Sequence, residues 1–404
     1  MKKNIDYKLF FTVVALVVFG MIMISSVSVY SSFKLTDRMV ASGFIENSYN
    51  YFYVLRNMAH VFIFMIVLGL MTKINYTVFE KYSKHIFGFS IILLLLVLII
   101  GMSMKGAKGW INIPGIPFTI QPTEFLKVAL IIFFASFFKK YKGYLKNFKK
   151  GYIPFMGFLC GIVFLVGLQP DFGTIMVIVP ITVIMYFYAG MNEKHLLYTI
   201  GLGVVLILSV YSAGDYDEVT GKNNNTLGYI RQRIDNFLDD SEESIKNKTI
   251  NYQTEQALIA IGSGGFKGLG FGGSIQKFGY LPEVQGDFIF SVIIEELGFI
   301  GGLVLLSMYM YIGYRGLYIA SRVSDYFAKY TAIGFSSRIL IQTFINVGVN
   351  LNIVPLTGIT LPFVSYGGSS LLSLGFGLGI LLSISRHVDS EQQFSRLNRN
   401  KIMF

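Results

Sequence analysis

Long uninterrupted apolar stretches constrain this chain more than any other feature. Residues 9–29, 86–104 and 288–312 each approach or exceed the roughly 20 apolar residues with which an α-helix crosses about 30 Å of hydrocarbon. Only 14% of the residues are charged and 53% are hydrophobic, whereas about a quarter of the residues in a soluble domain are charged. The first stretch is also longer than the core of a signal peptide. These features predict an all-α polytopic membrane protein.

The hydropathy pattern predicts about ten transmembrane helices with one large extracytoplasmic loop. The expected spans lie near residues 8–29, 52–72, 85–104, 122–138, 152–168, 173–190, 195–213, 288–313, 330–351 and 366–385. Spans one to seven thus occupy residues 1–213, the large loop residues 214–287, spans eight to ten residues 288–385, and a tail residues 386–404.

The charge distribution predicts the orientation. The connection "KKYKGYLKNFKK" (residues 139–150) has six lysines and no acid, and the other loops on its side are also basic. Because cytoplasmic loops carry an excess of Lys and Arg, both termini and the tail are expected to be cytoplasmic. The net charge of +11 therefore reflects membrane topology and does not call for a nucleic acid partner.

The large loop contains two segments with distinct patterns. In "LGYIRQRIDNFLDD", apolar residues recur at positions 227, 230, 234 and 237, while Arg231 and Arg233 lie off that stripe. This pattern predicts a short amphipathic helix, either at the membrane surface or packed on the outer face of the protein. Further on, seven glycines lie between Gly262 and Gly273, but no strand precedes them and no Gly-Lys-Ser/Thr follows. Two interpretations remain, a flexible re-entrant loop or a backbone nest for a phosphate.

Carboxylates cluster where the large loop enters span eight. Asp287, with Glu283 nearby, lies directly before "FIFSVII", and a carboxylate there could accept a proton from a substrate hydroxyl or simply stabilise a helix N-terminus. Glu295 and Glu296 lie about two turns inside the span, where ionisable groups usually face a cavity or a structural partner. Arg338 is the expected partner for these two glutamates.

Two turns on the outer side also carry charge. "QPDFGT" places Asp171 between spans five and six, and "KGAKGWINIPG" places Lys108 and Trp110 between spans three and four. Outer lysines suggest an anionic ligand, whereas the indole also suits an interfacial anchor. Glu124 and Lys127 in "QPTEFLK" are spaced for a local ion pair.

Several motifs together resemble the SEDS family (shape, elongation, division and sporulation), which includes FtsW and RodA. They are "GAKGWI", "QPTEFLK", "QPDFGT", "YQTEQALIAIGSGGFKGLGFGGSIQKFGYLPEVQGDFIFSVIIEELGFIG" and "PLTGITLPFVSYGGSSLL", in order along the chain. These motifs are closer to those of FtsW than to those of RodA. The resemblance implies a peptidoglycan glycosyltransferase that polymerises lipid II at the outer face of the bacterial cytoplasmic membrane, in cell division or cell elongation.

The resemblance also implies roles for particular residues. The essential aspartate of the family falls on Asp287, which would act as base on the acceptor hydroxyl. Lys108, Lys277 and the loop arginines are candidates to stabilise the pyrophosphate leaving group, together with a divalent cation such as Mg²⁺ or Mn²⁺. Ser365, in the last motif, is a further substrate-binding candidate. The chain departs from the family in reading "PEVQGD" for "PEAHTD" and "GAKGW" for "GARRW".

Other functions remain open at this point. A transporter (flippase) of a lipid-linked wall precursor would use Glu295, Glu296 and Arg338 along its route, and a scaffold would use its carboxylates structurally. A polymerase of this kind also implies a class B penicillin-binding protein (a transpeptidase) as partner, alongside other cell-wall synthesis or division proteins.

Overall fold

The computed structural model describes residues 4–104, 107–112, 119–215, 227–238 and 249–402. Among these described residues, eight helices are long and apolar enough to cross a membrane. They are α1 (Tyr7–Val27), α3 (Phe52–Lys73), α5 (Ser83–Ile100), α7 (Ile153–Gly167) with the π-helical turn η2 (Phe148–Tyr152), α9 (Glu193–Ala213), α13 (Ile289–Arg322), α14 (Tyr326–Asn350) and α15 (Gly368–Ile402), whose apolar part is Gly368–Val388.

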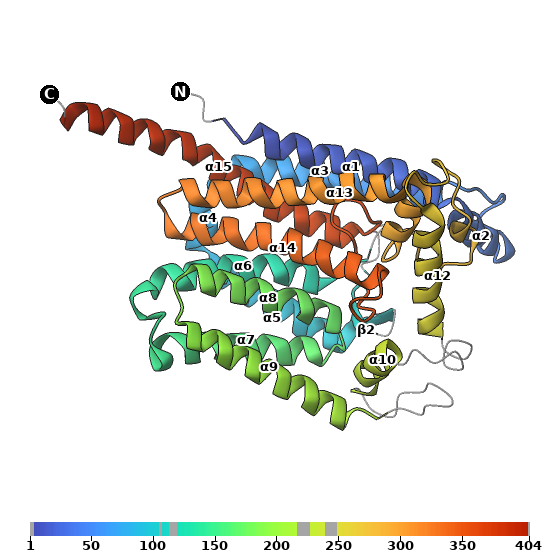
Figure 1. Ribbon diagram of the computed structural model, residues 1–404, viewed down its shortest axis with the longest axis horizontal. Helices are drawn as coiled ribbons and strands as arrows, with labels where there is room; N and C mark the ends of the chain where they lie inside the picture. The colour runs from blue at the N-terminus through green and yellow to red at the C-terminus, as the bar shows by residue number, and fades with distance from the viewer. Residues whose placement is uncertain (1–3, 105–106, 113–118, 216–226, 239–248, 403–404) are drawn as a thin grey trace.

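Two further helices, α6 (Pro122–Lys140) and α8 (Phe172–Tyr188), run alongside them in the same bundle (Figure 1). The polytopic α-helical class is therefore confirmed, and each of the ten expected spans corresponds to a helix. Two helices continue well past the expected spans, α13 to Arg322 and α15 to Ile402.

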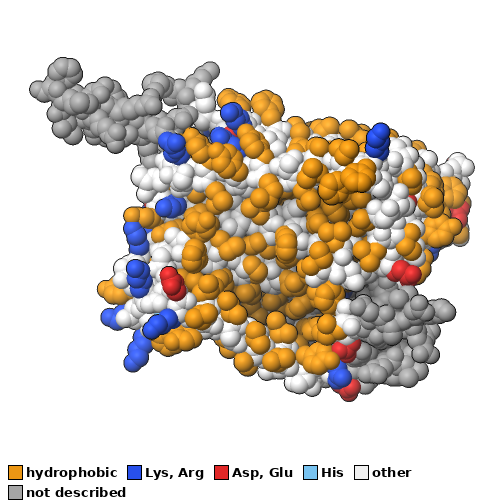
Figure 2. Space-filling view, viewed as in Figure 1, with side chains coloured by type: hydrophobic (Ala, Val, Ile, Leu, Met, Phe, Trp, Pro, Cys, Tyr) orange, Lys and Arg blue, Asp and Glu red, His pale blue; other side chains and the backbone are white. Residues whose placement is uncertain are grey.

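The middle of the bundle is formed by α6, α14 and α15. In the apolar window of α15, 89% of the residues are buried inside the protein, whereas in α9 none is. Since α9 contributes almost nothing to the core, its apolar side chains face outward, as expected for a helix at the edge of a bundle in lipid. Figure 2 shows apolar side chains spread across the middle of the visible face.

Shorter elements gather at one end of the bundle, which we call the loop end (right in Figure 1). They are α2 (Val29–Ala41), the antiparallel hairpin β1 (Met102–Met104) and β2 (Ala107–Trp110), α10 (Gly228–Leu238), α12 (Thr249–Gly264) and the 3₁₀ turn η3 (Gln276–Phe278). At the opposite end, α4 (Tyr76–Lys81) and the 3₁₀ turn η1 (Lys142–Tyr144) connect neighbouring helices.

The expected amphipathic helix is α10. It contacts α9 and α12, and Ile230, Arg233 and Asn236 on it are buried. It is therefore packed on the protein, the second of the two predicted alternatives.

Helix α13 is broken at Gly298, two residues after Glu296. Gly298 has φ 69° and ψ −174°, a conformation that only glycine adopts readily. The break frees backbone groups that must find partners if they are not to lie unpaired in the membrane. The glycine-rich loop supplies them, because Leu269 N and Gly270 N donate to the carbonyls of Glu295 and Glu296 at 2.9 and 3.0 Å.

Candidate functional site

A cavity of about 460 Å³ opens at the loop end. Its walls come from α3, β2, the starts of α6 and α8, the turn before α13, and the segment between α14 and α15. Four of the predicted site residues line it: Trp110, Asp171, Glu283 and Asp287. A cavity of this size, with polar groups converging on an otherwise apolar bundle, is the usual form of a ligand site.

Two side chains of α14 hold the main chain of Asp287 in place. Its carbonyl accepts hydrogen bonds from the side-chain amides of Asn346 (2.9 Å) and Asn350 (3.0 Å). Asn350 also accepts from Ser291 N and Oγ in the first turn of α13, at 3.1 and 2.6 Å. Asp287 itself is 6% exposed and its carboxylate oxygen Oδ2 lies beside Gly358. Two neighbouring helices thus hold the backbone of Asp287, whose side chain lines the cavity.

The turn that precedes Asp287 is clamped to the segment before α15. Ser365 Oγ donates to Gly286 O at 2.7 Å, and Tyr366 N donates to Gln285 O at 2.8 Å. Glu283 adopts a left-handed conformation (φ 54°), which an L-residue takes up only when its surroundings enforce it. Ser365, predicted to bind substrate, therefore holds the turn that carries Asp287 and does not itself line the cavity.

A cationic and aromatic wall from α3 faces the same cavity and was not predicted. Arg56 lies over the Phe52 ring at 5.0 Å, and Tyr53 packs edge-on against Tyr366 with ring centroids 5.0 Å apart. Burial raises the pKa of the Tyr366 phenol above its usual value, against the opposing charge of Arg56, so the hydroxyl stays protonated at neutral pH. A cation one turn inside an apolar span was the signal that could have found Arg56.

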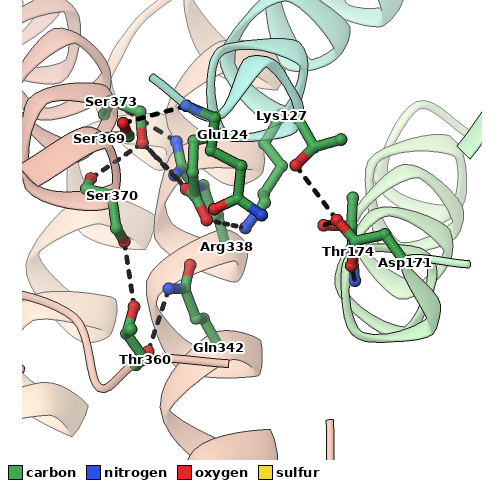
Figure 3. A network of polar contacts seen from close by, with 12 residues as sticks. Glu124, Lys127, Asp171, Thr174, Arg338, Gln342, Thr360, Ser369, Ser370 and Ser373 are labelled. Atoms are coloured by element: carbon green, nitrogen blue, oxygen red, sulfur yellow. Dashed lines mark hydrogen bonds and ion pairs between the residues drawn. The ribbon is translucent and has the colours of Figure 1, made fainter. Parts of the chain in front are cut away.

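The wall formed by α6 contains a buried ion-pair network (Figure 3). Glu124 Oε1 accepts from Lys127 at 2.7 Å, and Glu124 Oε2 accepts from Arg338 at 2.9 Å and from Ser373 at 3.1 Å. The expected Glu124–Lys127 pair is confirmed. The expected pairing of Arg338 with Glu295 or Glu296 is wrong, because the guanidinium reaches α6.

Asp171 caps α8 at the edge of the cavity. Its carboxylate accepts from Thr174 N (2.9 Å), Thr174 Oγ1 (2.7 Å) and Thr123 Oγ1 (3.2 Å) (Figure 3). With these three donors Asp171 caps α8 and ties it to α6. Lys108 belongs to the β2 strand, but its side chain lies outside the described residues.

The carboxylate of Glu295 accepts hydrogen bonds from the glycine-rich loop and does not line the cavity. It accepts from Ser274 Oγ at 2.5 Å and from Ile275 N at 2.9 Å. Leu269 N and Gly270 N also donate to the broken helix. The conformation of the glycine-rich loop is therefore explained by its hydrogen bonds to α13. The phosphate-nest interpretation is therefore not supported, because these amides already have acceptors.

Lys277 lies in a buried ion pair. Its ammonium donates to Glu296 Oε1 (2.8 Å), to Ser26 Oγ on α1 (2.9 Å) and to Gly272 O (2.7 Å). All three N–H donors of an ammonium are thus used. Lys277, predicted to bind pyrophosphate, and Glu296, predicted to be a substrate or transport residue, both lie away from the cavity and pair with each other.

The two loop arginines brace the loop end. Arg231 pairs with Asp235 at 3.4 Å and donates to Gly214 O at 3.0 Å. Arg233 donates to the carbonyl of Leu356, in the segment that also carries Gly358. Neither arginine lines the cavity.

The arrangement suits proton abstraction from a bound hydroxyl. It combines a carboxylate on a firmly held backbone, Asp287, with a permanent cation, Arg56, in one cavity. Within the described residues, no group of three or more His, Cys, Asp or Glu side chains could hold a metal ion. The donors among these described residues therefore do not by themselves make up a metal centre.

Comparisons with known proteins find relatives that match almost the whole chain. A family model described as "Cell cycle protein" (FtsW, RodA, SpoVE) matches residues 7–390. The chain is 35% identical over 393 residues to stage V sporulation protein E of Bacillus subtilis, covering 96% of this chain and 98% of that protein. It is also 35% identical over 387 residues to the probable peptidoglycan glycosyltransferase FtsW of Trichlorobacter lovleyi, covering 94% and 93%.

Solved structures share the fold. The crystal structure of the rod shape determining protein RodA of Thermus thermophilus matches with a TM-score of 0.66 and 25% identity, covering 95% of this chain and 97% of that one. A chain from a peptidoglycan synthase complex, in a structure concerned with the coordination of polymerization and crosslinking, matches with a TM-score of 0.73 and 23% identity over 95% and 98% of the two chains.

Proposed function

Since the chain belongs to the cell cycle protein family of FtsW, RodA and SpoVE, we propose that it is a peptidoglycan glycosyltransferase that polymerises lipid II into glycan strands. The observation that carries the proposal is the cavity at the loop end, with Asp287 on its wall. A lipid-linked sugar presents its reactive end at the membrane edge, and the cavity opens where the apolar spans end.

Asp287 is the general base in this proposal. Its carboxylate takes the proton of the GlcNAc 4-hydroxyl of the acceptor, and that oxygen forms a bond to the MurNAc anomeric carbon of the donor with inversion. The bond from that carbon to the phosphate oxygen breaks, and undecaprenyl pyrophosphate leaves with the bonding electrons. The asparagine contacts from α14 support this role, because a base must be held within hydrogen-bond reach of the proton it removes.

Arg56 takes the charge-stabilising role for which Lys277 was a candidate. Of the described residues that line the cavity, Arg56 is the one with a permanent positive charge. A cation positioned where negative charge develops on the pyrophosphate stabilises the transition state. Lys108 remains a second candidate, since it is two residues from Trp110 on the cavity wall.

The protein is a multi-pass membrane protein, and we place the loop end at the outer face of the bacterial cytoplasmic membrane with both termini in the cytoplasm. Lysines and arginines gather at the end opposite the loop end (left in Figure 2), which supports that orientation through the positive-inside rule. Residues 214–287 are then the extracytoplasmic loop and residues 386–404 the cytoplasmic tail.

A class B penicillin-binding protein is the proposed partner, because polymerised strands require crosslinking. The chain in the peptidoglycan synthase complex has the same fold, which supports such an assembly. We expect that partner to contact α13, α14 or the extracytoplasmic loop.

The test is polymerisation of labelled lipid II by purified protein, with and without the partner, comparing wild type with Asp287→Asn. Loss of a general base lowers turnover by about 10²–10⁴-fold. Glu193→Gln, an exposed acid at the start of α9 away from the cavity, is the control and should retain activity. Equal thermal unfolding of all three proteins would show that the loss is chemical. Strands from Asp287→Asn at the wild-type rate would refute the base assignment.

The same assay separates the enzyme from a transporter. Glu295 and Glu296 are engaged in buried contacts away from the cavity, whereas Arg338 is paired with Glu124 in the cavity wall. The three residues therefore do not form one continuous polar route. Inactivity of the wild type with its partner, alongside movement of lipid II across vesicle membranes, would favour the transporter.

A further inference from the structure

A second cavity lies at the end of the bundle opposite the loop end. It has a volume of about 560 Å³ and lies between the start of α1, the last turns of α3 and Arg386 on α15. We call it the terminal groove. None of its lining residues belongs to the cavity that holds Asp287.

The walls of the terminal groove are apolar and face outward. Met65, Gly69 and Lys73 follow one another at intervals of four residues and therefore lie on one face of α3. Tyr7 and Phe10, one turn apart on α1, form the other wall. Met65 is 37% exposed and Tyr7 52% exposed, so both present apolar surface to the surroundings of the bundle. In a membrane those surroundings are acyl chains.

The rim of the terminal groove is positively charged. Lys73 is the last residue of α3, and Arg386 donates to Thr72 O at 3.1 Å, which holds its guanidinium next to Lys73. The described residues that line the groove include no acid. The carboxylate of nearby Asp6 is engaged by Leu9 N at 3.0 Å and by Arg315, so it does not cancel this charge.

We propose that the terminal groove binds one anionic phospholipid of the adjacent leaflet. The phosphate lies between Lys73 and Arg386, at the level where the α1 and α3 spans end, and an acyl chain follows the wall past Gly69. Basic pockets between transmembrane helices on the cytoplasmic side are suited to anionic headgroups. A soluble phosphate would satisfy the rim but leave the apolar walls unfilled, so the groove fits a lipid.

The test is native mass spectrometry of the full chain in detergent, titrated with phosphatidylglycerol or with phosphatidylcholine of the same acyl chains. Wild type should retain one phosphatidylglycerol more tightly than phosphatidylcholine, and inorganic phosphate should not displace it. Each cation near a membrane surface contributes about fivefold in affinity, so Lys73→Gln with Arg386→Gln should weaken phosphatidylglycerol binding by roughly 25-fold.

A second variant tests the walls without altering charge. A Cβ at Gly69 meets nothing within 4 Å, so Gly69→Leu fills the groove without a clash in the protein. It should remove the retained lipid. Gly88→Leu, also in open space on α5, and Lys149→Gln, an exposed lysine of η2, are the matched controls and should bind as wild type does.

Three results would overturn the proposal. Equal retention of the two lipids would show no preference for anionic headgroups. Unchanged binding by the Lys73→Gln, Arg386→Gln protein would show that the rim does not hold the phosphate. Weakening by the charge changes with no effect of Gly69→Leu would indicate surface electrostatics without a groove site.

Discussion

The Lys277–Glu296 pair offers the sharpest test of how the loop end is held together. Glu296 is 0% exposed and Lys277 4% exposed, and their contact of 2.8 Å joins η3 to α13, with Ser26 bringing in α1. Removing one partner leaves an uncompensated buried charge, which costs about 3–5 kcal/mol. Lys277→Met and Glu296→Met should each lower the free energy of unfolding by that amount.

The double variant should recover most of the loss. Replacing a buried ion pair by apolar groups of similar size is often neutral or stabilising, so Lys277→Met with Glu296→Met should lie near wild type. The coupling energy of the cycle is then at least about 3 kcal/mol. Unfolding in mixed micelles, titrated with a denaturing detergent, measures each free energy.

A matched cycle on Arg231 and Asp235 serves as the control. That pair is 33% and 20% exposed in its side chains and 3.4 Å apart, so its coupling should be about 0.3–0.5 kcal/mol. Additive effects of Lys277→Met and Glu296→Met would refute the reasoning, because they would mean that the ammonium does not depend on the carboxylate. Lys277 would then become available again as a ligand for an anionic substrate.

Two further predictions concern the backbone around the site. Asn346→Ala removes a donor from the carbonyl of Asp287 and should lower the polymerisation rate about tenfold or more, in a protein that still assembles in the membrane; an unchanged rate would show that the remaining clamp is enough. Gly298→Ala places a Cβ against the backbone of Gly268 at a φ of 69°, and should cost about 3 kcal/mol or more in unfolding free energy, whereas Gly161→Ala, in open space on α7, should cost less than 1 kcal/mol.

The sequence predicts the membrane spans of this fold well because the bilayer imposes their length and polarity. Helices α6 and α8 were also expected, although α6 carries Glu124 and Lys127 and α8 has 17 residues. Hydropathy does not predict the break in α13, because Gly298 looks in sequence like any other glycine of an apolar helix. For the same reason the sequence alone leaves a phosphate site in the glycine-rich loop possible, because it does not show that the loop amides bond to the carbonyls of Glu295 and Glu296.

The candidate site was predicted in part. Asp287, Asp171 and Trp110 were found from their positions at span ends, where local sequence is informative. The predicted partner of Arg338 was wrong because its actual partner, Glu124, lies 214 residues away along the chain. Local sequence spacing carries no information about such a contact. Arg56 was not predicted, although a cation one turn inside an apolar span is itself a signal.

Trp110 is the one tryptophan among the 404 residues, and it lies half-buried on the wall of the cavity. All indole emission of the unmodified protein therefore comes from beside the site of the proposed reaction. A sugar or pyrophosphate that enters would change the polarity around that single ring and shift its emission maximum. The protein thus contains its own fluorescent probe, and occupancy of the cavity can be followed in real time without a label or an engineered residue.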